Sequence, residues 1–174
     1  MAATMGSEAT AAAVDQAAIR RDPMAMLPFC GYNMADYWSH WLKLGAKMKY
    51  APKIFRVNWF RKDEKGEFIW PGFGENMRVL NWIFDRVNGI QKAAKSPFGY
   101  MPRHQDLNWD GLDFCSEDFN DIMSINRDKG IEEVTAQKEL FDEFGERLPP
   151  ELESQREALE SRLNVSPPVW RSTS

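Results

Sequence analysis

Aromatic and apolar residues recur at helical spacing in residues 34–48, which read MADYWSHWLKLGAKM. The residues at that spacing are Tyr37, Trp41 and Leu44, with Trp38 alongside. Asn33 precedes the segment, and asparagine often caps helix N-termini because its side-chain oxygen accepts from a free backbone N–H. The pattern predicts a helix here, with Gly45 either ending it or tolerated inside it.

A second helical stripe lies in residues 77–87. Its apolar positions are Val79, Leu80, Ile83, Phe84 and Val87. They follow the i, i+3, i+4, i+7 spacing of one helix face. Glu75 or Asn76 is expected to open this helix, and Gly89 stands where a glycine stop belongs.

Between these helices the pattern changes to alternation. Residues 53–60 (KIFRVNWF) are rich in β-formers and predict a strand. The polar residues 61–67 contain a glycine and predict a hairpin connection. Residues 68–70 predict a short return strand, so the segment is expected to form a β-hairpin.

Helical patterns return after an irregular stretch over residues 90–113. A capping pattern at Ser116 opens one helix, and two strongly charged amphipathic segments, 132–148 and 149–163, predict two more. Helices combined with a hairpin predict a mixed α/β fold.

The same patterns divide the chain into three parts. Residues 1–22 are rich in small side chains and are expected to be mobile. Residues 23–163 are expected to form the packed domain, and residues 164–174 an unstructured tail.

Composition limits the classes of partner. The chain has 174 residues, which suggests one domain, and 22 basic against 26 acidic residues, a net charge of −4. This charge gives no reason to expect nucleic acid or a membrane as partner, and no apolar run approaches the roughly 20 residues of a membrane span.

The N-terminus does not resemble a secretory signal. Cys30 and Cys115 stand far apart, so we expect a reduced pair in an intracellular protein.

Patterns for catalysis or metal binding are absent from the sequence. Its two histidines, His40 and His104, form no zinc spacing with the distant cysteines. His40 is expected to be a packed or hydrogen-bonded core residue and His104 to lie in a polar loop. GFGENM lacks the third glycine of a dinucleotide fingerprint, and there is no GxxxxGK[ST] loop. No catalytic residue and no metal ligand is therefore predicted.

The segment from Asn58 to Asn76 holds five aromatic residues in a turn-rich stretch. Loops seldom carry so much apolar surface, because they face water. One interpretation is a hydrophobic cluster that ties the hairpin to the following helix. The other is a slot for a planar base. The residues alone leave both open.

The base-slot interpretation assigns roles to particular residues. Phe60 ends one strand, Phe68 starts the next, and Phe73 lies in a glycine-flanked turn that could return it over Phe60. Stacking contributes ~1–3 kcal/mol per base but tolerates any base. Choosing one base needs hydrogen bonds to its edge, and Asn76 has both a donor and an acceptor.

Four stretches of the sequence together resemble a known family. They are SEATAAA, DPMAMLPFCGYNMADYWSHWL, KIFRVNWFRKDEKGEFIWPGFGENMRVLNWIFDRV and GYMPRHQDLNWDGL. In this order they are similar to the C-terminal, nucleotide-binding part of GTP-dependent phosphoenolpyruvate carboxykinase. The similarity covers residues 2–163 and is most specific over residues 53–87.

The resemblance implies an activity and a site. The family converts oxaloacetate and GTP to phosphoenolpyruvate, CO₂ and GDP in gluconeogenesis, with Mn²⁺ and Mg²⁺. It holds guanine between two phenylalanines, here Phe60 and Phe73, with a third, here Phe68, beside them. An asparagine, here Asn76, reads the base edge. The nucleotide-binding residues implied are Phe60, Phe68, Phe73, Gly74, Glu75 and Asn76.

The resemblance also implies a C-terminal lobe truncated on its N-terminal side. The family's P-loop, metal ligands and oxaloacetate-binding arginine lie upstream of the matched part, so this chain alone is expected to be inactive. Residues 1–22 resemble the start of the family's mobile lid, although Gly6 and Leu27 stand where the family has arginines.

Three hypotheses remain open at this point. The chain is part of a carboxykinase, a non-catalytic guanine-nucleotide-binding module, or an interaction protein whose aromatic cluster is core. The family is usually monomeric. A cytoplasmic location is expected, with mitochondria as the alternative.

Overall fold

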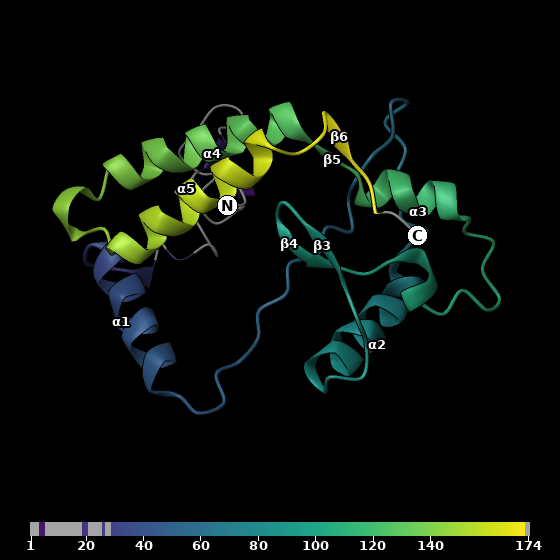
Figure 1. Ribbon diagram of the computed structural model, residues 1–174, viewed down its shortest axis with the longest axis horizontal. Coiled ribbons are helices and arrows are strands. Elements are labelled where there is room, and N and C mark those ends of the chain that lie inside the picture. Colours follow the sequence, from purple (N-terminus) through teal and green to yellow (C-terminus); the bar gives the residue numbers. More distant parts are fainter. Residues whose placement is uncertain (1–3, 6–18, 21–25, 27–28, 173–174) are drawn as a thin grey trace. The chain divides into compact units, whose positions relative to one another are not determined.

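The structure is a computed structural model that describes residues 4–5, 19–20, 26 and 29–172 (Figure 1). The chain divides into two compact units, and each is described by itself. Unit 1 contains Met1–Tyr50 and Ile131–Ser161, and unit 2 contains Ala51–Gly130 and Arg162–Ser174.

Most of the segment that resembles a lid, residues 1–22, lies outside the described residues, as do Gly6 and Leu27. The backbone described near the two ends of the segment forms a short antiparallel pair. In this pair β1 (Thr4–Met5) lies beside β2 (Ile19–Arg20).

Helix α1 (Met34–Lys47) is the first predicted helix and belongs to unit 1. The side-chain oxygen of Asn33 accepts from the backbone N–H of Ala35 at 2.9 Å, which confirms the predicted N-cap. Gly45 is tolerated inside the helix, which continues to Lys47.

The core of unit 1 forms around Trp38. Its buried members are Met34, Ala35, Trp38 and Phe141. Trp38 lies edge-on to Phe144, with ring centroids 4.8 Å apart. Leu44, at the end of the predicted stripe, is exposed. The prediction of His40 as a core residue is wrong, because it is exposed and lies about 200° around the helix from Trp38.

The two charged helices predicted near the C-terminus are present. They are α4 (Arg127–Asp142) and α5 (Pro150–Asn164), joined through the short 3-10 turn η6 (Gly145–Arg147). α4 both begins and ends earlier than the predicted segment 132–148, and Gly145–Arg147 forms the separate turn η6. In the unit 1 part of α5, the buried Arg156 pairs with Glu153 at 2.7 Å and Glu160 at 2.9 Å, so its charge is compensated.

The strand predicted over residues 53–60 is not formed in unit 2. The hairpin is reduced to one antiparallel bridge between Lys62 and Phe68. A physical reason lies in Asn58, whose side-chain oxygen accepts from the backbone N–H of Phe60 at 3.0 Å. This local turn takes a donor that a strand ladder would need. β-rich sequence without a paired partner does not make a strand.

Helix α2 (Asn76–Val87) follows a 3-10 turn, η4 (Phe73–Glu75), and begins where the sequence predicted. Gly89, with a φ of 76°, follows its C-terminal cap as expected.

The predicted apolar stripe of α2 is only half covered. Val79 and Ile83 pack against the core around Trp82, whose side chain is 4% exposed and was not in the predicted stripe. The other members, Leu80, Phe84 and Val87, are exposed. α2 therefore has apolar residues on two faces, and periodicity does not show which one is covered.

The core of unit 2 contains the buried residues Trp82, Leu107, Phe114 and Phe119. The elements around it are β3 (Ala94–Ser96), its antiparallel partner β4 (Gly99–Met101), η5 (His104–Asp106) and α3 (Ser116–Met123). β4 lies beside α2, where the Arg86 guanidinium is 5.5 Å from the centre of the Tyr100 ring (Figure 1). The cap of α3 is Cys115 rather than the predicted Ser116.

The described part of the C-terminal tail differs from the unstructured tail that was predicted. β6 (Val169–Trp170) pairs antiparallel with β5 (Ile125–Asn126). The partner strand lies far away in sequence, so local composition gave no sign of this pairing. Helices and short antiparallel sheets together confirm the predicted mixed α/β class.

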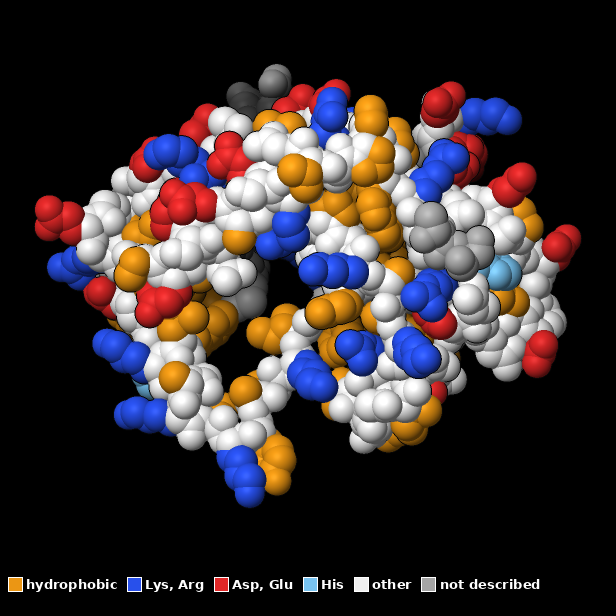
Figure 2. Space-filling view, viewed as in Figure 1, with side chains coloured by type: hydrophobic (Ala, Val, Ile, Leu, Met, Phe, Trp, Pro, Cys, Tyr) orange, Lys and Arg blue, Asp and Glu red, His pale blue; other side chains and the backbone are white. Residues whose placement is uncertain are grey.

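Many large hydrophobic side chains are exposed, and Figure 2 shows hydrophobic side chains at the surface among charged ones. The largest exposed fractions include those of Phe29, Tyr50, Ile54, Phe73 and Val165. None of the helices in the described part of the chain is long and apolar enough to cross a membrane.

Candidate functional site

The hairpin turn of unit 2 brings two of the predicted site residues together. The rings of Phe60 and Phe68 meet edge to face, with centroids 6.1 Å apart. Their exposed fractions are 72% and 57%. The Lys62 ammonium lies 4.8 Å from the centre of the Phe68 ring, a cation–π contact that occupies one side of this ring. Phe60 therefore remains the more open of the two stacking surfaces.

Phe73 stands apart from this pair. It begins η4, is 91% exposed, and makes no ring contact among the described residues. Gly72 before it has a φ of 129°, a backbone conformation that favours glycine and sets the direction of the turn. The expected return of Phe73 over Phe60 is thus not seen as a ring contact, and its face is open to solvent.

Asn76 is held at the start of α2 by a tryptophan. The indole Nε1–H of Trp70 donates to Oδ1 of Asn76 at 2.8 Å. Trp70 is 6% exposed and packs against Trp59 and Phe114, with ring centroids 5.7 and 6.1 Å apart. Trp70 was not among the predicted site residues. A general rule pointed to a role for it, because the indole N–H of a buried tryptophan needs an acceptor nearby.

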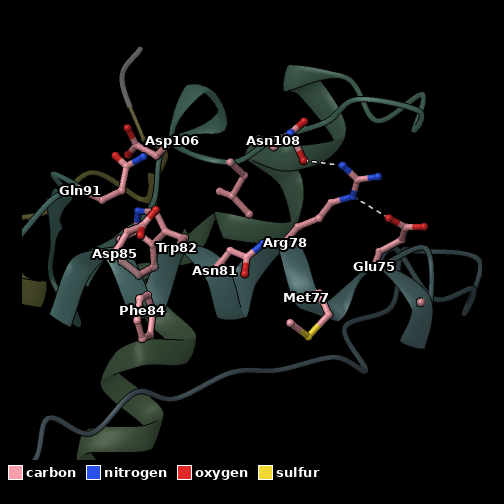
Figure 3. A pocket seen from close by; sticks show the side chains of 12 residues that line it. Glu75, Met77, Arg78, Asn81, Trp82, Phe84, Asp85, Gln91, Asp106 and Asn108 are labelled. Carbon is pink, nitrogen blue, oxygen red and sulfur yellow. Dashed lines mark hydrogen bonds and ion pairs between the residues drawn. The ribbon is translucent and has the colours of Figure 1, made fainter. Parts of the chain in front are cut away.

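An ion pair between Glu75 and Arg78 stabilises the same turn. Figure 3 shows the Arg78 side chain reaching from α2 between Glu75 and Asn108. The guanidinium forms an ion pair with Glu75 and donates to the backbone carbonyls of Asn108 and Asp110. Glu75 therefore fixes the turn to a neighbouring loop.

A cavity of about 500 Å³ lies beside the ion pair of Glu75 and Arg78 (Figure 3). It is lined by residues of η4, α2 and the loop after η5, among them Gly74, Glu75, Asn81 and Asp85. Two predicted site residues, Gly74 and Glu75, thus line a cavity, whereas the three phenylalanines do not.

Arg61 anchors the hairpin turn to the end of α3. Its guanidinium donates to the carbonyl of Ile122 at 2.8 Å and to the carbonyl and hydroxyl oxygens of Ser124 at 2.7 and 2.8 Å. Burial lowers the pKa of this guanidinium, although the charge of Asp121 acts in the opposite direction. The arginine holds the segment that carries Phe60 and Phe68.

The arrangement offers aromatic faces and a fixed amide to a flat polar ring. Exposed aromatic faces lie in the same short segment as a fixed amide, and a carboxylate there is already neutralised by Arg78. Among the described residues no three or more His, Cys, Asp or Glu side chains gather where they could hold a metal ion.

Comparison with protein families gives the class. Residues 1–162 match the family described as "Phosphoenolpyruvate carboxykinase C-terminal P-loop domain", and the chain belongs to this family. The family resemblance inferred from the sequence is confirmed, and the fold is that of a C-terminal carboxykinase domain.

Particular relatives carry the name "Phosphoenolpyruvate carboxykinase [GTP]". The chain is 49% identical over 167 residues to that of Treponema pallidum (strain Nichols), which covers 93% of this chain and 27% of the relative. It is 45% identical over 166 residues to that of Chlamydia abortus, a match that covers 94% of this chain and 28% of the relative. It is 44% identical over 167 residues to that of Anaeromyxobacter dehalogenans (strain 2CP-1), a match that covers 95% of this chain and 28% of the relative. The chain thus spans about a quarter of the length of these relatives.

Proposed function

We propose that this chain supplies the guanine-binding part of a GTP-dependent phosphoenolpyruvate carboxykinase. The reaction of the whole enzyme is oxaloacetate and GTP to phosphoenolpyruvate, CO₂ and GDP, a step of gluconeogenesis. The observation that carries the proposal is the exposed phenylalanine surface in the same segment as an oriented Asn76 amide. The names of the relatives support the nucleotide and the reaction.

Each site residue has a proposed role. Phe60 and Phe73 stack on the two faces of guanine, because both rings are largely exposed. Phe68 supports Phe60 from the side, and Asn76 reads the base edge. Gly74 and Glu75 form the turn between them, and the ion pair of Glu75 with Arg78 keeps that turn in place.

The phosphate and metal chemistry is proposed for the longer enzyme. The family implies Mn²⁺ and Mg²⁺, whose donor set is not found among the described residues. We therefore assign no step to a metal here and expect no turnover from residues 1–174 alone.

The remaining proposals concern organisation and location. We propose residues 1–22 as a lid-like segment and residues 23–163 as a partial nucleotide-binding domain. GTP or GDP is the direct ligand, and oxaloacetate and phosphoenolpyruvate are ligands of the whole enzyme. For the whole enzyme we propose a monomer in the cytoplasm, with mitochondria as the alternative; the relatives named above are bacterial.

Calorimetric titration of the purified chain with GTP and then ATP, beside a thermal melt, tests the proposal. Saturable binding that prefers GTP supports it. In Asn76→Ala the preference for GTP over ATP should fall, because stacking does not choose a base but an edge contact does. Unchanged selectivity in this variant would count against Asn76. A cooperative melt without nucleotide binding would favour an interaction protein instead.

A further inference from the structure

The hydrogen bond between Trp70 and Asn76 joins a buried side chain to a predicted ligand-binding side chain. The indole Nε1–H lies 2.8 Å from Asn76 Oδ1, and Trp70 is almost fully buried. Contacts with Trp59 and Phe114 hold the indole without any ligand. The bond is thus part of the folded site before a nucleotide arrives.

This bond determines which end of the Asn76 amide faces outward. An asparagine amide has an oxygen that accepts and a nitrogen that donates, and the two ends have nearly the same shape. An indole N–H only donates, so it selects the oxygen and would oppose the NH₂ group. The amide nitrogen of Asn76 is therefore left to donate, and among the described residues it has no recorded acceptor.

We propose that Trp70 is a positioning residue that sets the base specificity of this site. This inference rests on the guanine-binding function proposed above. Guanine carries an acceptor oxygen at C6, whereas adenine carries a donor amino group at the same position. An amide held with its donor outward complements the 6-oxo group and opposes the 6-amino group. Trp70 thus excludes adenine without touching the nucleotide.

The backbone supports the same arrangement. The Asn76 backbone N–H donates to the carbonyl of Phe73, so the reading amide and the exposed ring are joined through η4. Because the Asn76 amide is held by Trp70 and its backbone N–H by the carbonyl of Phe73, little ordering of this amide is left for the ligand to bring about, which favours selective binding.

The test compares Trp70→Phe with Trp59→Phe in the whole 174-residue chain, by calorimetric titration with GTP and with ATP. Trp70→Phe keeps an aromatic ring and removes the N–H. Trp59→Phe is a matched control, because its indole lies in the same cluster and has no recorded acceptor among the described residues.

We expect the GTP-over-ATP preference to fall roughly tenfold in Trp70→Phe, the effect of one lost hydrogen bond. ATP affinity should hold or rise, because the freed amide can turn its oxygen toward the adenine amino group. Trp59→Phe should keep the preference.

A wild-type measurement keeps the proposal testable if Trp70→Phe fails to fold. The triphosphate of 2,6-diaminopurine riboside retains the 2-amino group of guanine and replaces the 6-oxo group by an amino group. We expect it to bind as poorly as ATP. Binding equal to that of GTP would overturn the proposal.

The other outcomes are equally distinct. If wild type prefers GTP and Trp70→Phe retains that preference, or weakens both nucleotides equally, the positioning role of Trp70 is wrong while the proposed function stands. If wild type binds neither nucleotide, the proposed function fails and this inference fails with it.

Discussion

At the scale of single residues, the aromatic side chains of unit 2 form two groups. Trp70 and Trp82 are almost fully buried, whereas Phe60 and Phe73 are largely exposed. A buried ring contributes to stability through the area it removes from water, and an exposed ring contributes little. The exposed rings are therefore the ones free to stack on a ligand.

Phe73→Ala should weaken GTP binding by ~1–3 kcal/mol, the usual effect of losing one stacked aromatic. The free energy of unfolding should change by less than about 0.5 kcal/mol, because the ring is 91% exposed. Titration calorimetry and urea unfolding measure the two quantities. Phe29→Ala, an exposed phenylalanine of unit 1, is the control and should alter neither. A large loss of stability with unchanged binding would instead identify Phe73 as a core residue.

At the scale of elements, the hairpin turn has little pairing of its own. It has one bridge, between Lys62 and Phe68, and the backbone hydrogen bonds from Ile69 to Arg61 at 3.0 Å and from Asp63 to Glu67 at 2.9 Å. The three hydrogen bonds of the Arg61 side chain to the end of α3 add a tertiary anchor to this short pairing.

Arg61→Ala should lower the free energy of unfolding by ~1–3 kcal/mol, because the carbonyls of Ile122 and Ser124 lose a charged donor. Urea unfolding measures this change. Arg56→Ala is the matched control, since Arg56 is exposed and has no recorded hydrogen bond among the described residues. Equal effects of the two substitutions would show that the anchor is unimportant.

Helix α1 allows a stabilising substitution. Gly45 lies inside α1, and an added Cβ would meet nothing within 4 Å. Gly45→Ala should raise the free energy of unfolding by ~0.5–1 kcal/mol through helix propensity. Gly89→Ala is the contrasting variant and should destabilise, because its φ of 76° disfavours a side chain. Thermal melts of both variants would reveal the opposite signs, and a lower melting temperature for Gly45→Ala would contradict the argument.

At the scale of the whole molecule, unpartnered apolar surface is the main feature. On α2 alone, Met77, Leu80, Phe84 and Val87 are exposed at helical spacing. Exposed apolar patches favour association.

The chain should therefore associate with rising concentration, as measured by light scattering. The double substitution Leu80→Gln and Phe84→Gln should reduce this association while circular dichroism stays unchanged, because both side chains are exposed. Asn81→Gln on the same helix is the polar control. A monomer at all concentrations, for wild type and variants alike, would disprove the prediction.

Catalysis is also a property of the whole molecule. Phosphoryl transfer depends on positioned phosphates and metal ions, and among the described residues no three or more His, Cys, Asp or Glu side chains gather at one point. The purified chain, given oxaloacetate, GTP, Mn²⁺ and Mg²⁺, should form no detectable phosphoenolpyruvate in a coupled assay. GTP-dependent product from rigorously purified protein would refute this.

The sequence by itself determined the features that depend on neighbouring residues. Asn33 caps α1 because its acceptor and the free N–H are two residues apart. Glu75 or Asn76 and Gly89 marked the ends of α2, where the Glu75 side chain makes no capping hydrogen bond and Gly89 has a φ of 76° that suits a glycine. The family and the α/β class were also predictable from local motifs. The nucleotide-binding roles of the candidate residues between 60 and 76 stay a prediction.

Only the tertiary structure decided what depends on a distant partner. Residues 53–60 have strand propensity but form no ladder, and β6 exists because residues 125–126 lie beside it. The covered face of α2 and the role of Trp70 were likewise decided by packing, since burial turns an indole N–H into a group that needs an acceptor. Local chemistry specifies caps and turns, whereas pairing and burial require surfaces that the chain brings together only on folding.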